Sequence, residues 1–240
     1  MNKLKNMLIA AIAIVGLSTS AFAGTANIGI VTSMMTVDAN GTETDTLTAG
    51  GANVADTSIR NKAISDDVFT GSIFAEYTID AAWALTAGVE VTPGKANIGG
   101  NFIRNDVEAS ITGTESTLAN NVSRTVEATA GNFGTAYIEA PLFAGIYVRA
   151  GLSQMSVDYT TTSSATSAGS YTDQLDLKGT NFGVGIKGNR EGFVYKLAYE
   201  ETDYDGFSLR SAGNSVAANS NAITGDLDTK GVRLSIGKSF

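Results

Sequence analysis

Apolar and polar residues alternate with a period of two along most of the chain beyond residue 26. Such alternation predicts β-strands with one apolar face and one polar or small face. No helical period interrupts the pattern. It predicts eight strands, at 27–37, 68–79, 82–91, 133–140, 143–159, 175–187, 193–204 and through the final segment 231–240.

The connections between these segments alternate between long polar stretches and tight turns. Tight turns are expected at 80–81, 141–142 and 189–191, and the long stretches include 38–67 and 160–173, which are rich in Thr, Ser, Gly and Asp. Pro93 is expected to end the third strand, because proline has no N–H for a sheet ladder. This order predicts antiparallel strands connected up and down.

The final segment, GVRLSIGKSF, shows the two faces clearly. Its apolar face holds Val232, Leu234, Ile236 and Phe240, and its other face holds small residues and Arg233. Across the eight segments the second face is mostly Gly, Ser, Ala or Asn with single charges. Small residues suit the interior of a narrow barrel. The pattern therefore predicts an all-β fold, an eight-stranded antiparallel up-and-down transmembrane β-barrel, and the alternative is a secreted soluble β-sandwich.

Segment length and aromatic placement agree with a membrane barrel. A membrane strand needs about 9–11 residues, which most segments supply. Aromatic girdles are expected at both membrane boundaries. The aromatic residues near short turns are Tyr77, Trp83, Phe143, Phe193 and Phe240, and those towards long connections are Phe69, Tyr159 and Tyr199.

The N-terminus has the layout of a secretory signal peptide. Lys3 and Lys5 precede a ten-residue apolar core at 8–17, and small residues Ala21 and Ala23 end the segment. This arrangement predicts cleavage after Ala23. The domains expected are the signal peptide at 1–23 and the barrel at 24–240.

Composition limits the chemistry that the chain can perform. It has no cysteine and no histidine, so the commonest metal ligand and the commonest general base are both missing. The sequence indicates no cofactor and no enzyme activity. Without Lys3 and Lys5 the net charge moves from −8 to −10, which disfavours binding to nucleic acid.

Eight charged residues fall on the small-residue face and are expected to point into the lumen. They are Glu76, Glu90, Glu139 and Glu200, with Arg149, Lys187, Lys196 and Arg233. Charges in a narrow interior must be paired. Two interpretations stay open: a structural plug of ion pairs, or a narrow, gated pore whose selectivity these charges set.

Two motif fragments have simpler explanations. Gly183 to Gly188 spells G-x-G-x-x-G, but it lies within a predicted strand, whereas a dinucleotide site needs a helix after it. The acidic stretches 38–45 and 203–206 match only parts of a calcium loop, and both are expected to be solvated loops.

Together, the signal peptide, the eight alternating strands, the long outer loops and the terminal Phe240 resemble the small outer-membrane barrels of Gram-negative bacteria, of the OmpA transmembrane-domain, OmpX and opacity-protein type. The resemblance implies an outer-membrane location with both termini in the periplasm. It also implies that the barrel-assembly machinery recognises a signal in the last strand. The residues of this signal here are Gly231, Leu234, Ile236 and Phe240. Lys238 departs from that pattern.

The resemblance implies a monomer whose partners are outer-membrane lipid, lipopolysaccharide and the secretion and assembly machinery. The ligand of the outer loops stays open. The expected function is a structural or envelope role, or a narrow pore for small solutes, with loops for surface contacts. The rival is a soluble adhesin or binding module.

Overall fold

The computed structural model describes residues 24–48, 55–79, 84–112, 115–163, 174–210 and 220–240. The predicted signal peptide with Ala21 and Ala23, the predicted turn at 80–81 and Trp83 lie outside these residues. The described part of the chain contains no helix long and apolar enough to cross a membrane.

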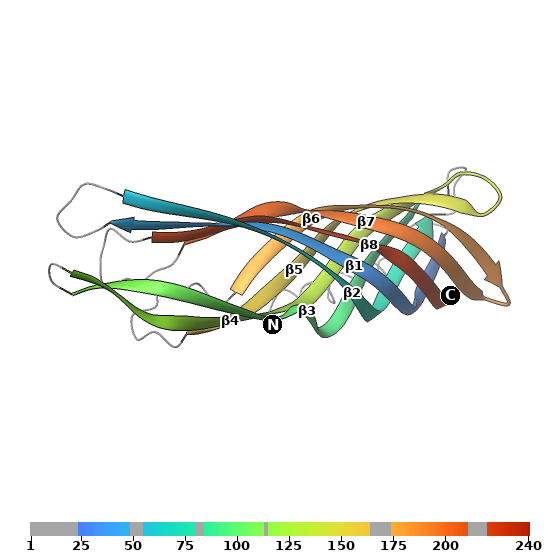
Figure 1. The fold of residues 1–240 in the computed structure, drawn as a ribbon. Coiled ribbons are helices and arrows are strands. Elements are labelled where there is room, and N and C mark those ends of the chain that lie inside the picture. Colours follow the sequence, from blue (N-terminus) through green and yellow to red (C-terminus); the bar gives the residue numbers. More distant parts are fainter. Residues whose placement is uncertain (1–23, 49–54, 80–83, 113–114, 164–173, 211–219) are drawn as a thin grey trace.

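Eight strands form one closed antiparallel ring in which each strand pairs with its neighbours in sequence and β8 pairs with β1. Figure 1 shows this up-and-down order. The fold class is confirmed, and the closed ring rules out the two separate sheets of a sandwich. The strands are β1 (Gly24–Thr48), β2 (Ala55–Ile79), β3 (Thr86–Thr112), β4 (Glu115–Pro141), β5 (Ile146–Ser163), β6 (Gln174–Arg190), β7 (Phe193–Arg210) and β8 (Ser220–Ser239).

Most strands extend well beyond the segments predicted from alternation, so the loop prediction for the polar stretch 38–67 is wrong for most of its length. β1 and β2 stay paired from Gly24↔Ile79 to Thr48↔Ala55, a run of 25 residue pairs. The extra part of the ladder is mostly polar on both faces, although it includes Ile59 and Ile64. It is held by backbone pairing and by cross-strand hydrogen bonds, such as the one from Thr42 Oγ1 to Asn61 Oδ1 at 2.9 Å. Alternation marks only where one face is apolar, so it missed these extensions.

Pro93 does not end β3, which corrects the prediction made for it. The strand continues to Thr112 and stays paired with β4, with a register shift between Thr92 and Lys95. The pairing that stops is the one with β2, whose last pair on this side is Ile73↔Val91. Proline lacks the N–H that the β2 ladder would need, and Gly94 has φ +100°.

The described tight turns lie slightly later in the chain than predicted. Between β4 and β5 the turn runs through 142–145 rather than 141–142, with φ 49° at Ala144 and φ 80° at Gly145. Between β6 and β7 it is centred on Glu191 (φ 55°) and Gly192 (φ 74°) rather than on 189–191. Positive φ at both central residues is the backbone of a type I′ hairpin, whose twist matches that of the strands.

The two ends of the strand ring meet at the end of the barrel that carries the short turns. β1 and β8 pair from Asn27↔Ser239 to Thr46↔Ser220. Beyond this ladder, the Phe240 N–H donates to Ala26 O at 2.9 Å, and the Ala26 N–H donates to Phe240 O at 3.3 Å. The last residue of the chain is thus tied into the ring.

The outer surface of the ring is apolar along the segments predicted to face lipid. The exposed large apolar residues include Ile28, Ile30, Met34, Ile73, Leu152, Phe182, Val184, Leu197, Val232, Leu234 and Ile236. The aromatic residues predicted to flank this band are also exposed at Phe69, Phe143, Phe193, Tyr199 and Phe240. This exterior apolar band is the reverse of the polar surface expected for a soluble domain.

The β1–β8 contact yields a test of ring closure. A Cβ added to Gly231 would lie 2.2 Å from the backbone oxygen of Met34, so Gly231→Ala must push the two strands apart. We expect it to lower the free energy of unfolding by about 1–3 kcal/mol. The measurement is denaturant unfolding of protein refolded in detergent micelles, in which no assembly machinery takes part.

Gly41→Ala is the matched control on the same strand pair. Its added Cβ would lie 3.7 Å from Thr224 O, an ordinary van der Waals contact. It is expected to unfold like the parent chain. Equal unfolding midpoints for the two variants would contradict close packing at the closure.

Candidate functional site: the barrel lumen

All eight charged residues predicted for the lumen point into it, and they come from seven of the eight strands. Seven of them are buried, and Lys187 is partly buried. Glu139 is 0% exposed, and Glu76 and Glu90 are each 1% exposed. These three carboxylates therefore have almost no contact with water.

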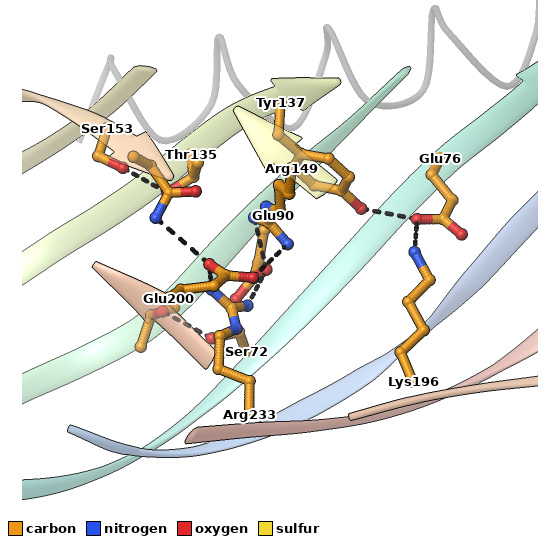
Figure 2. A network of polar contacts seen from close by, with 12 residues as sticks. Ser72, Glu76, Glu90, Thr135, Tyr137, Arg149, Ser153, Lys196, Glu200 and Arg233 are labelled. Carbon is orange, nitrogen blue, oxygen red and sulfur yellow. Dashed lines mark hydrogen bonds and ion pairs between the residues drawn. The ribbon is translucent and has the colours of Figure 1, made fainter. Parts of the chain in front are cut away.

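Four of these residues form an arginine cluster, which consists of Glu90, Arg149, Glu200 and Arg233. Arg149 pairs with Glu90 at 3.3 Å and with Glu200 at 3.1 Å. Arg233 pairs with Glu200 at 2.7 Å and also contacts Glu90. Each guanidinium thus bridges both carboxylates (Figure 2), a geometry that suits its fixed fork of donors.

The other four form a lysine cluster, which consists of Glu76, Glu139, Lys187 and Lys196. The Lys196 ammonium donates to both carboxylate oxygens of Glu139, at 2.7 and 2.9 Å, and also to Glu76. Lys187 lies 3.8 Å from Glu139 and is less buried. Asn27 Nδ2 donates to Glu76 at 3.1 Å, which satisfies another acceptor position of that carboxylate.

Two tyrosines join the clusters, and sequence reasoning did not include them in the site. The Arg149 guanidinium lies 3.6 Å from the centre of the Tyr137 ring, and the Tyr137 hydroxyl donates to Glu76 at 2.8 Å. Figure 2 shows this connection between the clusters. Tyr147 is 1% exposed, with the Lys196 ammonium 5.7 Å from its ring centre. Both tyrosines have the parity of the lumen face, which was the signal available in the sequence.

The glycines of the G-x-G-x-x-G stretch make room for these side chains. A Cβ on Gly183 would lie 2.6 Å from Glu200 Cγ, and one on Gly185 would lie 2.8 Å from the Tyr147 ring. Both residues lie within β6, as predicted, and face the lumen. Their small size thus serves packing inside the barrel.

Two apolar clusters adjoin the charged residues, and the sequence reasoning did not predict them. The smaller cluster is Val31, Phe74 and Val194, from β1, β2 and β7. The upper cluster is Val37, Met155, Leu177, Tyr204 and Leu227. Along β7 the inward residues are Val194, then Lys196 and Glu200, then Tyr204. The upper cluster therefore lies between the charges and the long strand ends. On β2, however, Phe74 lies between Ser72 and Glu76, so the smaller cluster packs beside the charges.

The residues predicted as an assembly signal lie along the second half of β8 and at its end. Leu234, Ile236 and Phe240 face outward and are exposed, whereas Gly231 packs against β1. Lys238, which fits the signal least well, also faces outward, and its ammonium lies 4.6 Å from the centre of the Phe193 ring. Its alkyl chain can cover apolar surface while the charge stays at the boundary.

The acidic residues considered as calcium-loop fragments lie on strands, so their prediction as loops is wrong. Asp38 is on β1, and Asp203 is on β7, beyond the exterior apolar band. Hydrogen bonds from Lys230, at 2.8 Å, and from Ser65 hold the pKa of Asp38 below its usual value. Desolvation and the nearby Asp203 raise the pKa of Asp228. Among the described residues, no group of three or more acidic side chains could hold a metal ion.

The lumen clusters predict a strong effect for the loss of one charge. Arg149→Ala leaves Glu90 and Glu200 buried with one cation between them, and we expect the free energy of unfolding to fall by about 3–5 kcal/mol. Denaturant unfolding of the refolded barrel measures it. Arg190→Ala removes an exposed arginine whose ion pair with Glu191 is 3.7 Å long, and it should cause no measurable change.

A double variant separates charge pairing from packing. Arg149→Ala with Glu90→Ala should cost less than the sum of the two single changes, because the pair is removed together. Additive costs would show that the two residues contribute independently and would contradict the cluster.

Comparisons with solved structures find other barrels. The outer membrane protein OprG from Pseudomonas aeruginosa matches with 14% identity and a TM-score of 0.46, over 91% of this chain and 97% of its own. The outer membrane protease OmpT from Escherichia coli matches with 9% identity and 0.45, over 92% and 100%. The attachment invasion locus protein Ail of Yersinia pestis matches with 11% identity and 0.40, over 91% and 100%. No protein-family profile and no curated protein matches the sequence.

Proposed function

We propose that this chain is an integral outer-membrane barrel that is closed along its axis and has a structural role in the cell envelope. The observation that carries the proposal is the distribution of side chains over the ring. Ion pairs fill the inside, and large apolar residues cover the outside. A barrel with this distribution is stable where lipid meets its outer face and no open sheet edge is left in the hydrocarbon.

The layered lumen favours the plug over the pore. The charged layer contains four acids and four bases, so it is balanced, and its carboxylates are buried. The upper apolar cluster would hinder the passage of water even if the charges moved. A narrow pore remains the alternative, and it would require both arginine bridges to part. The same pairing leaves no lumen carboxylate unopposed, which supports a role without catalysis.

The long ends of the strands would lie outside the cell and supply surface for contacts. β1 and β2 stay paired as far as Thr48↔Ala55, well beyond Met34 and Phe69 of the exterior apolar band, through a mostly polar stretch that also exposes Ile59. With the short turns in the periplasm, both ends of the barrel chain also lie there, which agrees with the pairing of Ala26 and Phe240.

Cell fractionation tests the location. Expressed in a Gram-negative host, the mature chain should be recovered in the outer membrane and be extracted only by detergent. Its migration in gel electrophoresis should change on heating, as the barrel unfolds. Recovery in the soluble periplasm or the medium would favour the soluble adhesin instead.

Conductance tests whether the axis is closed. In planar bilayers the purified barrel should give a flat trace at neutral pH, because the ion pairs and the upper apolar cluster block the lumen. The variants Arg149→Ala and Glu76→Ala should stay flat if they fold. Discrete steps in the parent chain that change in these variants would establish the pore instead.

Deletion of Phe240 tests the assembly signal. We expect the level of folded barrel in the outer membrane to fall several-fold, while the purified variant still refolds in detergent. Deletion removes both hydrogen bonds to Ala26, so Phe240→Ala, which keeps them, is the matched variant. Normal membrane levels for both variants would contradict the signal.

A further inference from the structure

The ring has one incomplete seam, between β2 and β3. These strands share only six residue pairs, from Ile73↔Val91 to Thr78↔Thr86, although both continue far beyond. The hairpin β1–β2 and the hairpin β3–β4 then separate, and their far ends lie apart (Figure 1). Each other neighbouring pair continues in the ladder well past the charged layer.

The local sequence keeps the seam open. Pro93 offers no N–H, Gly94 has φ +100°, and the register of β3 shifts between Thr92 and Lys95. Proline and lysine on an edge strand are the features that prevent further pairing. The Lys95 ammonium also forms an ion pair with Asp158 on β5, so its side chain extends away from β2.

A pocket of about 180 Å³ opens at this seam. Its walls are 68–71 of β2 and 92–96 of β3, and its inner end reaches Val37, Phe133 and Met155. Val37 and Met155 belong to the upper apolar cluster, and Phe133 packs against it. The pocket is slightly larger than an apolar cavity of about 150 Å³ that stays dry and binds benzene. Arg149 precedes Met155 along β5, so the ion pairs lie on the short-turn side of the pocket's inner end.

The mouth of the pocket lies at the outer boundary of the exterior apolar band. Phe69 lines it and is 75% exposed. One step further along the outer face of β2, Asp67 accepts a hydrogen bond from Thr36 at 2.7 Å. Lys95 also lines the pocket, and 60% of its side chain is exposed although its ammonium is paired with Asp158. The mouth thus has apolar surface on the membrane side and polar groups on the outer side.

From these observations we propose that the seam pocket binds one unbranched hydrocarbon chain of an amphiphile, which enters sideways between β2 and β3 while its polar head stays near Lys95. The proposal rests on membrane insertion of the barrel. The chain belongs to a membrane lipid or to a free fatty acid, since both present the same chemistry to the pocket. The apolar inner end provides the binding energy, because each buried methylene contributes about 0.8 kcal/mol.

Photolabelling tests this proposal. The probes are a palmitate carrying a diazirine near its chain end and a phosphatidylcholine with the same group on one acyl chain. With protein in phosphatidylcholine vesicles, labelled peptides should centre on 68–71 and 92–96. Labelling by either probe supports the proposal, and labelling by only one of them identifies the source of the chain.

A substitution that fills the pocket gives the decisive test of the proposal. Ala130 lines the pocket, and Ala130→Trp should lower labelling at these peptides by about tenfold, which corresponds to only two lost methylenes. Ala150→Trp is the matched control, because Ala150 is exposed on the outer face of β5 and does not line the pocket. Ala96→Trp, at the residue of β3 that pairs with Ala130, replaces Ala130→Trp if that variant does not fold.

The outcome that would overturn the proposal is even labelling around the apolar band that a folded Ala130→Trp barrel leaves unchanged. Vesicle flotation reports separately on the proposed function. If the protein does not float with the vesicles, membrane insertion fails, and the palmitate probe in detergent micelles still tests the pocket.

Discussion

Closure of eight strands into one ring is the constraint on which the rest of this structure depends. It forces every second side chain into a lumen so narrow that the Glu139 carboxylate is out of reach of water. A charge in such a place is tolerated only with a partner across the barrel. The alternate residues of each strand face outward all round the ring, so they contact the solvent that surrounds the barrel. Both the paired interior and the apolar exterior therefore follow from the same closure.

The interior is organised by the shapes of its cations as well as by its charge balance. Arg149 and Arg233 each bridge Glu90 and Glu200, which two planar forks can do at once. Lys196 is a point charge between Glu76 and Glu139, and its remaining surroundings are aromatic rings. Replacement of an arginine by lysine, or of the lysine by arginine, would therefore disrupt the geometry of these ion pairs even though it keeps the charge. Such specific bridging supports the plug proposed above, whereas conduction needs weak, interchangeable contacts.

The sequence could predict the barrel and the direction of its side chains, because parity is a local property of strands. It could therefore place Glu76 and Arg233 inside without any knowledge of their partners. It could not predict how far the strands extend, since the ladder between β1 and β2 has polar residues on both faces beyond Val37. It also could not distinguish the end of a strand from the end of one pairing, which is why Pro93 was assigned the wrong effect. The upper apolar cluster has lumen parity too, but its layering depends on the stagger between strands, which alternation does not encode.

The break between β2 and β3 is compatible with a stable ring because closure needs continuous pairing only at the level of the membrane and the charged layer. Six pairs, from Thr78↔Thr86 to Ile73↔Val91, complete the ring there. Above that level the upper apolar cluster would otherwise be sealed between the charges and the polar strand ends. Pro93 places the opening beside this cluster rather than beside the ion pairs, so the charges stay shielded from the outside. The axis and the side of the barrel thus differ in character: ion pairs cross the axis, whereas the pocket at the side is lined largely by apolar residues.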